Sequence, residues 1–130
     1  MIPRDDTPST KPLLDKLGVK PEMRVAVQGI EDDSFLAELG ARVAFGDDPQ
    51  NADMVFLAVN EPEHMTQLFQ LKEQIARNGA VWVVFRKGQK VFNENDVLRL
   101  GLESGMVDVK VVRFSDTHSA SKFVIRKADR

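Results

Sequence analysis

The sequence RVAVQGIEDD, residues 24–33, joins a short apolar run to one glycine and then to three acidic side chains. The apolar run over residues 23–27 predicts a buried strand, and Gly29 predicts a tight turn at its end. Asp32 or Asp33 can then accept hydrogen bonds from the free amides of a following helix. A strand, a glycine turn and a helix in this order are typical of proteins that alternate α and β elements.

Apolar runs and amphipathic segments alternate along the rest of the chain. Further strands are predicted over residues 42–45, 54–59, 80–85, 107–114 and 121–125. Helices are predicted to begin at Pro12, after Asp32 or Asp33, after Asn60, and after Asn93 or Asn95, and to end at Gly18, Gly40, Gly79 and Gly105. The alternation predicts a mostly parallel sheet with helices on both faces. Because only SDTHSA (residues 115–120) separates the last two strands, they are predicted to form an antiparallel hairpin.

The sequence allows more specific predictions for two of the connections between elements. About eight residues separate the second strand from the third, so that crossover is expected to be short and irregular. After the third strand, Asn60 is a suitable N-cap and Glu63 stands three positions later, which is the pattern of a capping box. The predicted core face of that helix consists of Met65, Leu68, Phe69, Ile75 and Ala76.

The composition narrows the class of protein. A length of 130 residues and a hydrophobic fraction of 42% fit one packed domain, expected over residues 12–130, after a flexible polar arm at residues 1–11. A net charge of −2 gives no general attraction to nucleic acid or to anionic membranes. The absence of cysteine excludes disulfides and cysteine-ligated zinc. No stretch reads as a signal peptide or a membrane span, so a cytoplasmic protein is expected.

Four stretches resemble class I S-adenosylmethionine-dependent methyltransferases. LGVKPEMRVAVQGI (residues 17–30) resembles the opening helix, first strand and cofactor loop of that family. GAVWVVFRKG (residues 79–88) resembles a later strand, and LGLESGMVDVKVVRF with SKFVIRK (residues 100–114 and 121–127) resembles the last helix and terminal hairpin. The resemblance implies a three-layer Rossmann-like α/β sheet, mostly parallel. Numbered along the chain, its strands would follow the order 2-1-3-4-6-5, with strand 6 antiparallel.

The whole chain also resembles a family of small bacterial proteins that is defined only as a domain of unknown function. The stretches LGVKPEMRVAV near the start and FVIRK at the end carry this resemblance. It implies no activity, so it adds nothing to the choice of function.

Two positions depart from the methyltransferase pattern. When Val25 and Gly29 are aligned with the family motif, Val27 stands where the family has an acid and Glu31 where it has a second glycine. The second glycine lets the backbone approach the cofactor, whereas Glu31 adds bulk and a negative charge near the cofactor's carboxylate. Asp47 matches the family's ribose-binding acid in position. The two departures argue against bound S-adenosylmethionine, so no cofactor is expected.

Candidate ligand-binding residues gather where the strand order would reverse, beyond the carboxyl ends of the first and third strands. They are Gly29, Ile30, Glu31, Asp47, Asn60 and Glu61. The alternative interpretation is that these residues form only a turn, a cap and solvated acids. A basic turn, RKGQK (residues 86–90), adds Lys87 and Lys90 as candidates for holding an anion, unless they are simply solvated. No aromatic residue is interleaved with these cations, which argues against nucleic acid.

The sequence SDTHS (residues 115–119) combines hydroxyl, acid and imidazole groups. Residues adjacent in sequence seldom have the geometry of a catalytic triad, and hairpin loops favour these residue types in any case. No catalytic residue is therefore assigned. His64 and His118 lack the spacing of a metal site, so no metal is predicted.

The sequence favours a degenerate, non-catalytic methyltransferase-like domain that binds a small ligand or a partner protein. The alternatives are an S-adenosylmethionine-dependent methyltransferase with an altered cofactor loop, and a nucleotide- or anion-binding module. The strands over residues 42–45 and 107–114 would form the edges of the sheet. Either edge could pair with a second copy in a homodimer, or with a partner protein.

Overall fold

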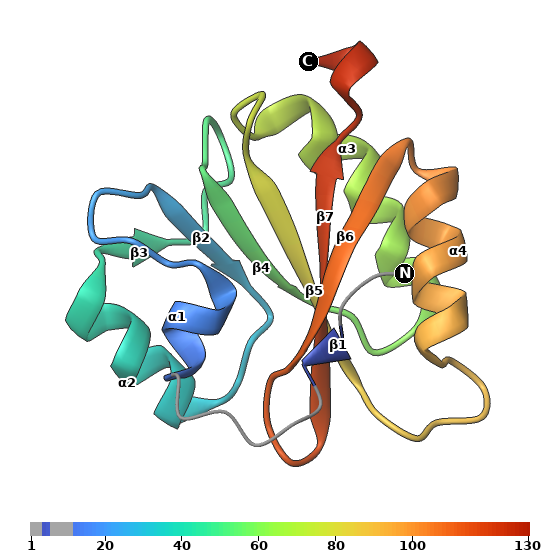
Figure 1. Ribbon diagram of the computed structural model, residues 1–130, viewed down its shortest axis with the longest axis horizontal. Coiled ribbons are helices and arrows are strands. Elements are labelled where there is room, and N and C mark those ends of the chain that lie inside the picture. The colour runs from blue at the N-terminus through green and yellow to red at the C-terminus, as the bar shows by residue number, and fades with distance from the viewer. Residues whose placement is uncertain (1–3, 6–11) are drawn as a thin grey trace.

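The computed structural model describes residues 4–5 and 12–130, which form one seven-stranded sheet with helices on both faces (Figure 1). The strands are β1 (Arg4–Asp5), β2 (Val25–Gln28), β3 (Phe45–Gly46), β4 (Met54–Ala58), β5 (Ala80–Arg86), β6 (Met106–Arg113) and β7 (His118–Ile125). The α-helices are α1 (Leu13–Leu17), α2 (Asp33–Arg42), α3 (Gln67–Gln74) and α4 (Glu94–Glu103), and two 3₁₀ helices are η1 (Pro62–Thr66) and η2 (Lys127–Asp129).

The strand order is β1-β6-β7-β5-β4-β2-β3. Read from β3, the six strands expected from the sequence follow the order 2-1-3-4-6-5, which confirms the predicted topology. Strand β7 runs antiparallel to both of its neighbours, β5 and β6, and every other pair in this sheet is parallel. The sheet therefore combines a parallel half, β5 to β3, with a C-terminal hairpin inserted beside β5.

Two apolar clusters lie on opposite faces of the sheet. On one face, the buried side chains of α1 and α2 pack against Phe56 and Trp82. On the other face, η1, α3 and α4 pack against Val55, Val81 and Phe123. Alternate residues of β4 and β5 thus face opposite clusters, which explains why both strands are almost continuously apolar.

Single contacts fix two of the helices on the sheet. The indole nitrogen of the fully buried Trp82 donates a hydrogen bond to the carbonyl oxygen of Leu17 at 3.1 Å, which joins α1 to β5. On the opposite face, Gly101 of α4 lies against the ring of Phe123 so closely that a Cβ would overlap the ring atoms. The glycine lets α4 approach β7 closely.

The second predicted strand and the helix before it end differently from the prediction. Helix α2 continues through Gly40 to Arg42, and β3 begins only at Phe45. The guanidinium of Arg42 donates to Asp15 Oδ1 at 2.7 Å and to the carbonyl oxygen of Val19 at 3.1 Å. These contacts with the α1 region hold Arg42 at the end of the helix. The connection from β3 to β4 contains no helix, as predicted.

The segment after β4 also differs from the prediction. A 3₁₀ helix, η1, precedes α3, and no side chain caps it. The backbone amide of Asn60 donates to His64 Nδ1 at 3.2 Å, so the histidine and not a capping box organises this turn. Phe69, expected in the core, is 55% exposed, whereas Met65, Leu68 and Ile75 are buried as predicted.

One edge of the sheet was predicted incorrectly. Strand β3 lies at an edge as expected, but β6 does not, because β1 pairs with it at Val111 and Val112. Apart from β1, the arm predicted over residues 1–11 lies outside the described residues. No helix in the described part of the chain is long and apolar enough to cross a membrane.

Candidate functional site

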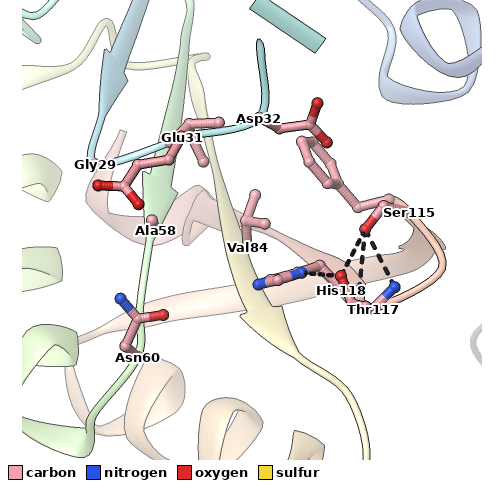
Figure 2. A pocket seen from close by; sticks show the side chains of 11 residues that line it. Gly29, Glu31, Asp32, Ala58, Asn60, Val84, Ser115, Thr117 and His118 are labelled. Carbon is pink, nitrogen blue, oxygen red and sulfur yellow. Dashed lines mark hydrogen bonds between the residues drawn. The ribbon is translucent and has the colours of Figure 1, made fainter. Parts of the chain in front are cut away.

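A pocket of about 380 Å³ lies beyond the carboxyl ends of β2, β4 and β5, where the strand order reverses (Figure 2). This is the position at which open α/β sheets bind ligands, and the volume lies within the usual range for small-molecule sites. The lining residues come from the turn after β2, from the ends of β4 and β5, and from the β6–β7 hairpin. They are Gly29, Ile30, Glu31, Asp32, Ala58, Asn60, Val84, Phe114, Ser115, Thr117 and His118.

The turn after β2 depends on glycine. Gly29 has a φ of 78°, in the left-handed region that other residues adopt only with strain. A Cβ at this position would also stand 3.3 Å from the Cβ of Ala58, at the end of the neighbouring strand. The turn therefore lies close against β4, and the pocket opens above an apolar floor formed by Ala58 and Val84 (Figure 2).

The two acids at the pocket have different local roles. Asp32 Oδ1 accepts a hydrogen bond from the amide of Phe35 at 3.0 Å, so Asp32 is the N-cap of α2. Glu31 is exposed and extends into the pocket from the β2 side (Figure 2). The carboxylate of Glu31 makes no hydrogen bond or ion pair with the described part of the chain. It is therefore free to contact a ligand.

The β6–β7 hairpin supplies the opposite side of the pocket, a hairpin wall formed by Ser115, Thr117 and His118. Ser115 Oγ accepts hydrogen bonds from the amides of Thr117 at 3.3 Å and His118 at 3.1 Å. Thr117 Oγ1 lies 2.7 Å from His118 Nδ1, which fixes the orientation of the imidazole. The other ring nitrogen points into the pocket, toward the side from which Asn60 extends (Figure 2).

The environment of His118 favours the neutral imidazole. Partial burial lowers the pKa of His118 below its usual value, and the positive charges of Arg86 and Lys87 lower it further. The carboxylate of Asp32 opposes this shift without reversing it. At neutral pH the imidazole is therefore an uncharged hydrogen-bonding group at the pocket.

Four of the eight predicted site residues line the pocket: Gly29, Ile30, Glu31 and Asn60. Asp47 does not line it; its carbonyl oxygen instead accepts a hydrogen bond from the side chain of Gln28 at 3.1 Å. Glu61, Lys87 and Lys90 also lie outside the lining. The backbone amide of Lys87 donates to the carbonyl oxygen of Thr117 at 2.9 Å, so a backbone hydrogen bond joins Lys87 to the hairpin wall.

The hairpin wall was not among the predicted ligand-binding residues, although the sequence contained a signal for it. The predicted order placed the last strand antiparallel beside the fourth strand. The start of β7 must then lie at the carboxyl end of β5, on the same edge of the sheet as Gly29. This topology places the loop SDTHS (residues 115–119), to which the sequence assigns no catalytic residue, beside the crevice.

Within residues 4–5 and 12–130, no group of three or more histidine, aspartate or glutamate side chains could hold a metal ion. The pocket's chemistry thus rests on carboxylate, amide, hydroxyl and imidazole groups above an apolar floor. This combination can hold a small organic molecule by hydrogen bonds and apolar contact.

No protein-family model matches the chain, and no curated protein matches it. Solved structures match with high probability at low sequence identity. A TehB-like SAM-dependent methyltransferase from Corynebacterium glutamicum aligns with a TM-score of 0.56 and 12% identity, over 88% of this chain and 85% of that chain. A SAM-dependent methyltransferase from Aquifex aeolicus aligns with a TM-score of 0.60 and 12% identity, over 88% of each chain. The fold is methyltransferase-like.

A third match is the pyocyanin biosynthetic protein PhzM, with a TM-score of 0.63 and 12% identity. It covers 87% of this chain, but the chain spans only about half of PhzM, 53% of its length. The resemblance stated from the sequence is thereby confirmed for the methyltransferase-like Rossmann fold. At these identities the likeness concerns the fold and carries no activity to this chain.

Proposed function

We propose that the chain is a non-catalytic, methyltransferase-like domain that binds a small organic ligand in the pocket between the β2 turn and the hairpin wall. The observation that carries the proposal is the convergence of Glu31, Asn60 and His118 above the apolar floor. These polar groups come from three separate parts of the sheet edge. A concave, partly apolar site with a few convergent polar groups is the usual form of a small-molecule site.

The cofactor features that the methyltransferase resemblance implies are altered in this chain. Val27, at the position of the family's acid, packs with the apolar cluster beneath α2. Glu31, at the position of the family's second glycine, adds a bulky side chain to the pocket lining, where a glycine would let the backbone approach the cofactor. Asp47, at the position of the family's ribose-binding acid, is outside the pocket lining. These three observations support a ligand other than S-adenosylmethionine and a role without methyl transfer.

A thermal-shift screen of small molecules, run on the wild type and on two matched variants, tests the proposed function. Asn60→Trp places a large side chain at the pocket, whereas Glu61→Trp adds the same side chain next to it, outside the lining. Both positions are exposed, so both variants are expected to fold. Ligands that stabilise the wild type and Glu61→Trp but not Asn60→Trp support the proposal. Ligands that stabilise all three proteins equally, or no stabilising ligand at all, contradict it.

A methyltransferase with an altered cofactor loop is the second candidate. It is favoured by Gly29, whose positive φ and close approach to Ala58 retain the form of a cofactor-binding turn. Calorimetric titration with S-adenosylmethionine and with its demethylated product separates the two candidates. Micromolar binding of either compound would favour this candidate over the first, and no heat of binding would favour the first.

The remaining alternatives have less support. The anion-binding alternative depends on Lys87 and Lys90, which do not line the pocket. Pairing in a homodimer, or with a partner protein, would use β3, where Phe45 is 37% exposed at the edge of the sheet. Light scattering over a range of concentrations tests the homodimer, and a constant monomer mass would contradict it.

A further inference from the structure

The charged side chains that line the pocket in the described part of the chain are acidic. Glu31 and Asp32 line it, and no lysine or arginine is among the lining residues in the described part of the chain. Arg86 and Lys87, whose positive charges lower the pKa of His118, are outside the lining. His118 itself is neutral at neutral pH for the reasons given above. The lining therefore carries net negative charge.

The start of a helix would ordinarily attract an anion, because its first amides are free and its dipole is positive there. At the start of α2, a carboxylate of the protein itself already fills this role. The Asp32 carboxylate accepts the amide of Phe35 at 3.0 Å and places a negative charge at the helix start. The N-terminus of α2 thus offers little to an anionic ligand.

Glu31 is the one lining acid that has no partner among residues 4–5 and 12–130. It extends from the β2 side, while Asn60 extends from the β4 side and the free ring nitrogen of His118 faces them from the hairpin wall (Figure 2). Between them lies the apolar floor of Ala58 and Val84. A positively charged group beside Glu31 would thus have an apolar surface next to it for the rest of the ligand.

We infer that the pocket selects small organic cations, in which an ammonium group pairs with Glu31 and an apolar body lies on the floor of Ala58 and Val84. This inference rests on the proposed ligand-binding function and specifies the chemical class of the ligand. Because Glu31 is exposed, its contribution is modest, and a cation should bind about twofold to fivefold more tightly than a neutral molecule of the same shape. An anion of that shape should bind more weakly than both.

Three probes of matched shape test the charge preference: benzylamine, benzyl alcohol and benzoate, titrated at about pH 7, where they are cationic, neutral and anionic. Amide NMR spectra report binding through shifts at Gly29, Ile30 and Ala58. The expected order of affinity is benzylamine, then benzyl alcohol, then benzoate. In Glu31→Gln, benzylamine should bind no more tightly than benzyl alcohol. In Asp33→Asn, which removes the same charge next to the pocket but outside its lining, the preference should persist.

The outcomes separate this inference from the proposed function. If benzyl alcohol or benzoate shifts the pocket amides at concentrations as low as benzylamine does, the selection for cations is wrong and the pocket remains a ligand site. A preference that survives in Glu31→Gln also overturns the inference. If no probe shifts the pocket amides, the inference is contradicted, and the comparison of Asn60→Trp with Glu61→Trp decides the proposed function independently.

Discussion

Gly29 lies against Ala58, so that the turn after β2 closes directly onto the end of β4, with 3.3 Å between a Cβ built on the glycine and the Cβ of the alanine. Both residues line the pocket, so this contact forms part of the pocket wall. The positive φ of Gly29 and the contact with β4 each oppose a larger side chain.

Gly29→Ala is expected to lower the free energy of unfolding by about 1 to 2 kcal/mol from the strained φ, with a further loss from the contact with Ala58. Gly88→Ala is the matched control, because Gly88 also has a positive φ, of 74°, but has open space where the Cβ would stand. Chemical denaturation measures both. Equal losses in the two variants would show that the contact with Ala58 is unimportant.

Two helical glycines should respond to alanine in opposite directions. Gly101→Ala places a methyl group into the ring of the buried Phe123, and a loss of about 1 to 3 kcal/mol is expected. Gly40→Ala in α2 meets only Phe45, at an ordinary 3.6 Å, and should gain about 0.5 to 1 kcal/mol from helix propensity. Thermal unfolding of the two variants checks the prediction. A stabilised Gly101→Ala would mean that α4 does not pack on β7 as described.

Removal of the α2 cap should cost more stability than removal of the neighbouring acid, Asp33. Asp32→Ala loses the hydrogen bond to the amide of Phe35, and about 1 kcal/mol is expected to be lost. Asp33→Ala removes an acid from the first turn of the same helix without removing the cap. If denaturant midpoints fall equally in both variants, the capping role of Asp32 is wrong.

The free energy of unfolding should decrease as the pH falls, partly because the unfolded chain protonates His118 more readily than the folded protein does. Burial, with Arg86 and Lys87, lowers the pKa of His118 in the folded protein, and Asp32 opposes this. As the pH falls below about 6.5, the unfolded chain takes up this proton first, so stability falls until the lowered folded-state pKa is passed. His118→Asn should therefore lose less stability than the wild type over that window. Denaturant midpoints across the window measure the loss.

If His118→Asn keeps the full wild-type acid dependence, the charged and buried surroundings of His118 do not influence folding.

The sheet was predictable because its strands have strong local signals. Residues 54–59 and 80–85 are almost continuously apolar, and in the structure both strands are buried on two faces. The order of the strands came from the methyltransferase resemblance and not from periodicity. Local patterns were less reliable where tertiary contacts decide the outcome. Gly40 does not end α2. The helix continues to Arg42, and the hydrogen bond from Arg42 to Asp15 stabilises the end of the helix at that residue.

Part of the candidate site was predictable, because its residues lie just after strands that have strong local signals. Gly29 directly follows β2 and Asn60 lies just after β4, so their place at the sheet edge could be derived from the sequence. His118 reaches the pocket only because β7 pairs with β5 across a large separation in sequence, and no local pattern contains that contact. Asp47 was misplaced because β3 ends at Gly46 and the Gln28 side chain holds the backbone of Asp47.

A crystal structure of the protein as purified tests the central claim most directly. The account predicts an open pocket that holds a small organic molecule in contact with the floor of Ala58 and Val84 and within hydrogen-bond distance of Glu31, Asn60 or His118. A pocket closed by its own side chains, or a bound molecule that lies elsewhere on the sheet edge, would contradict it.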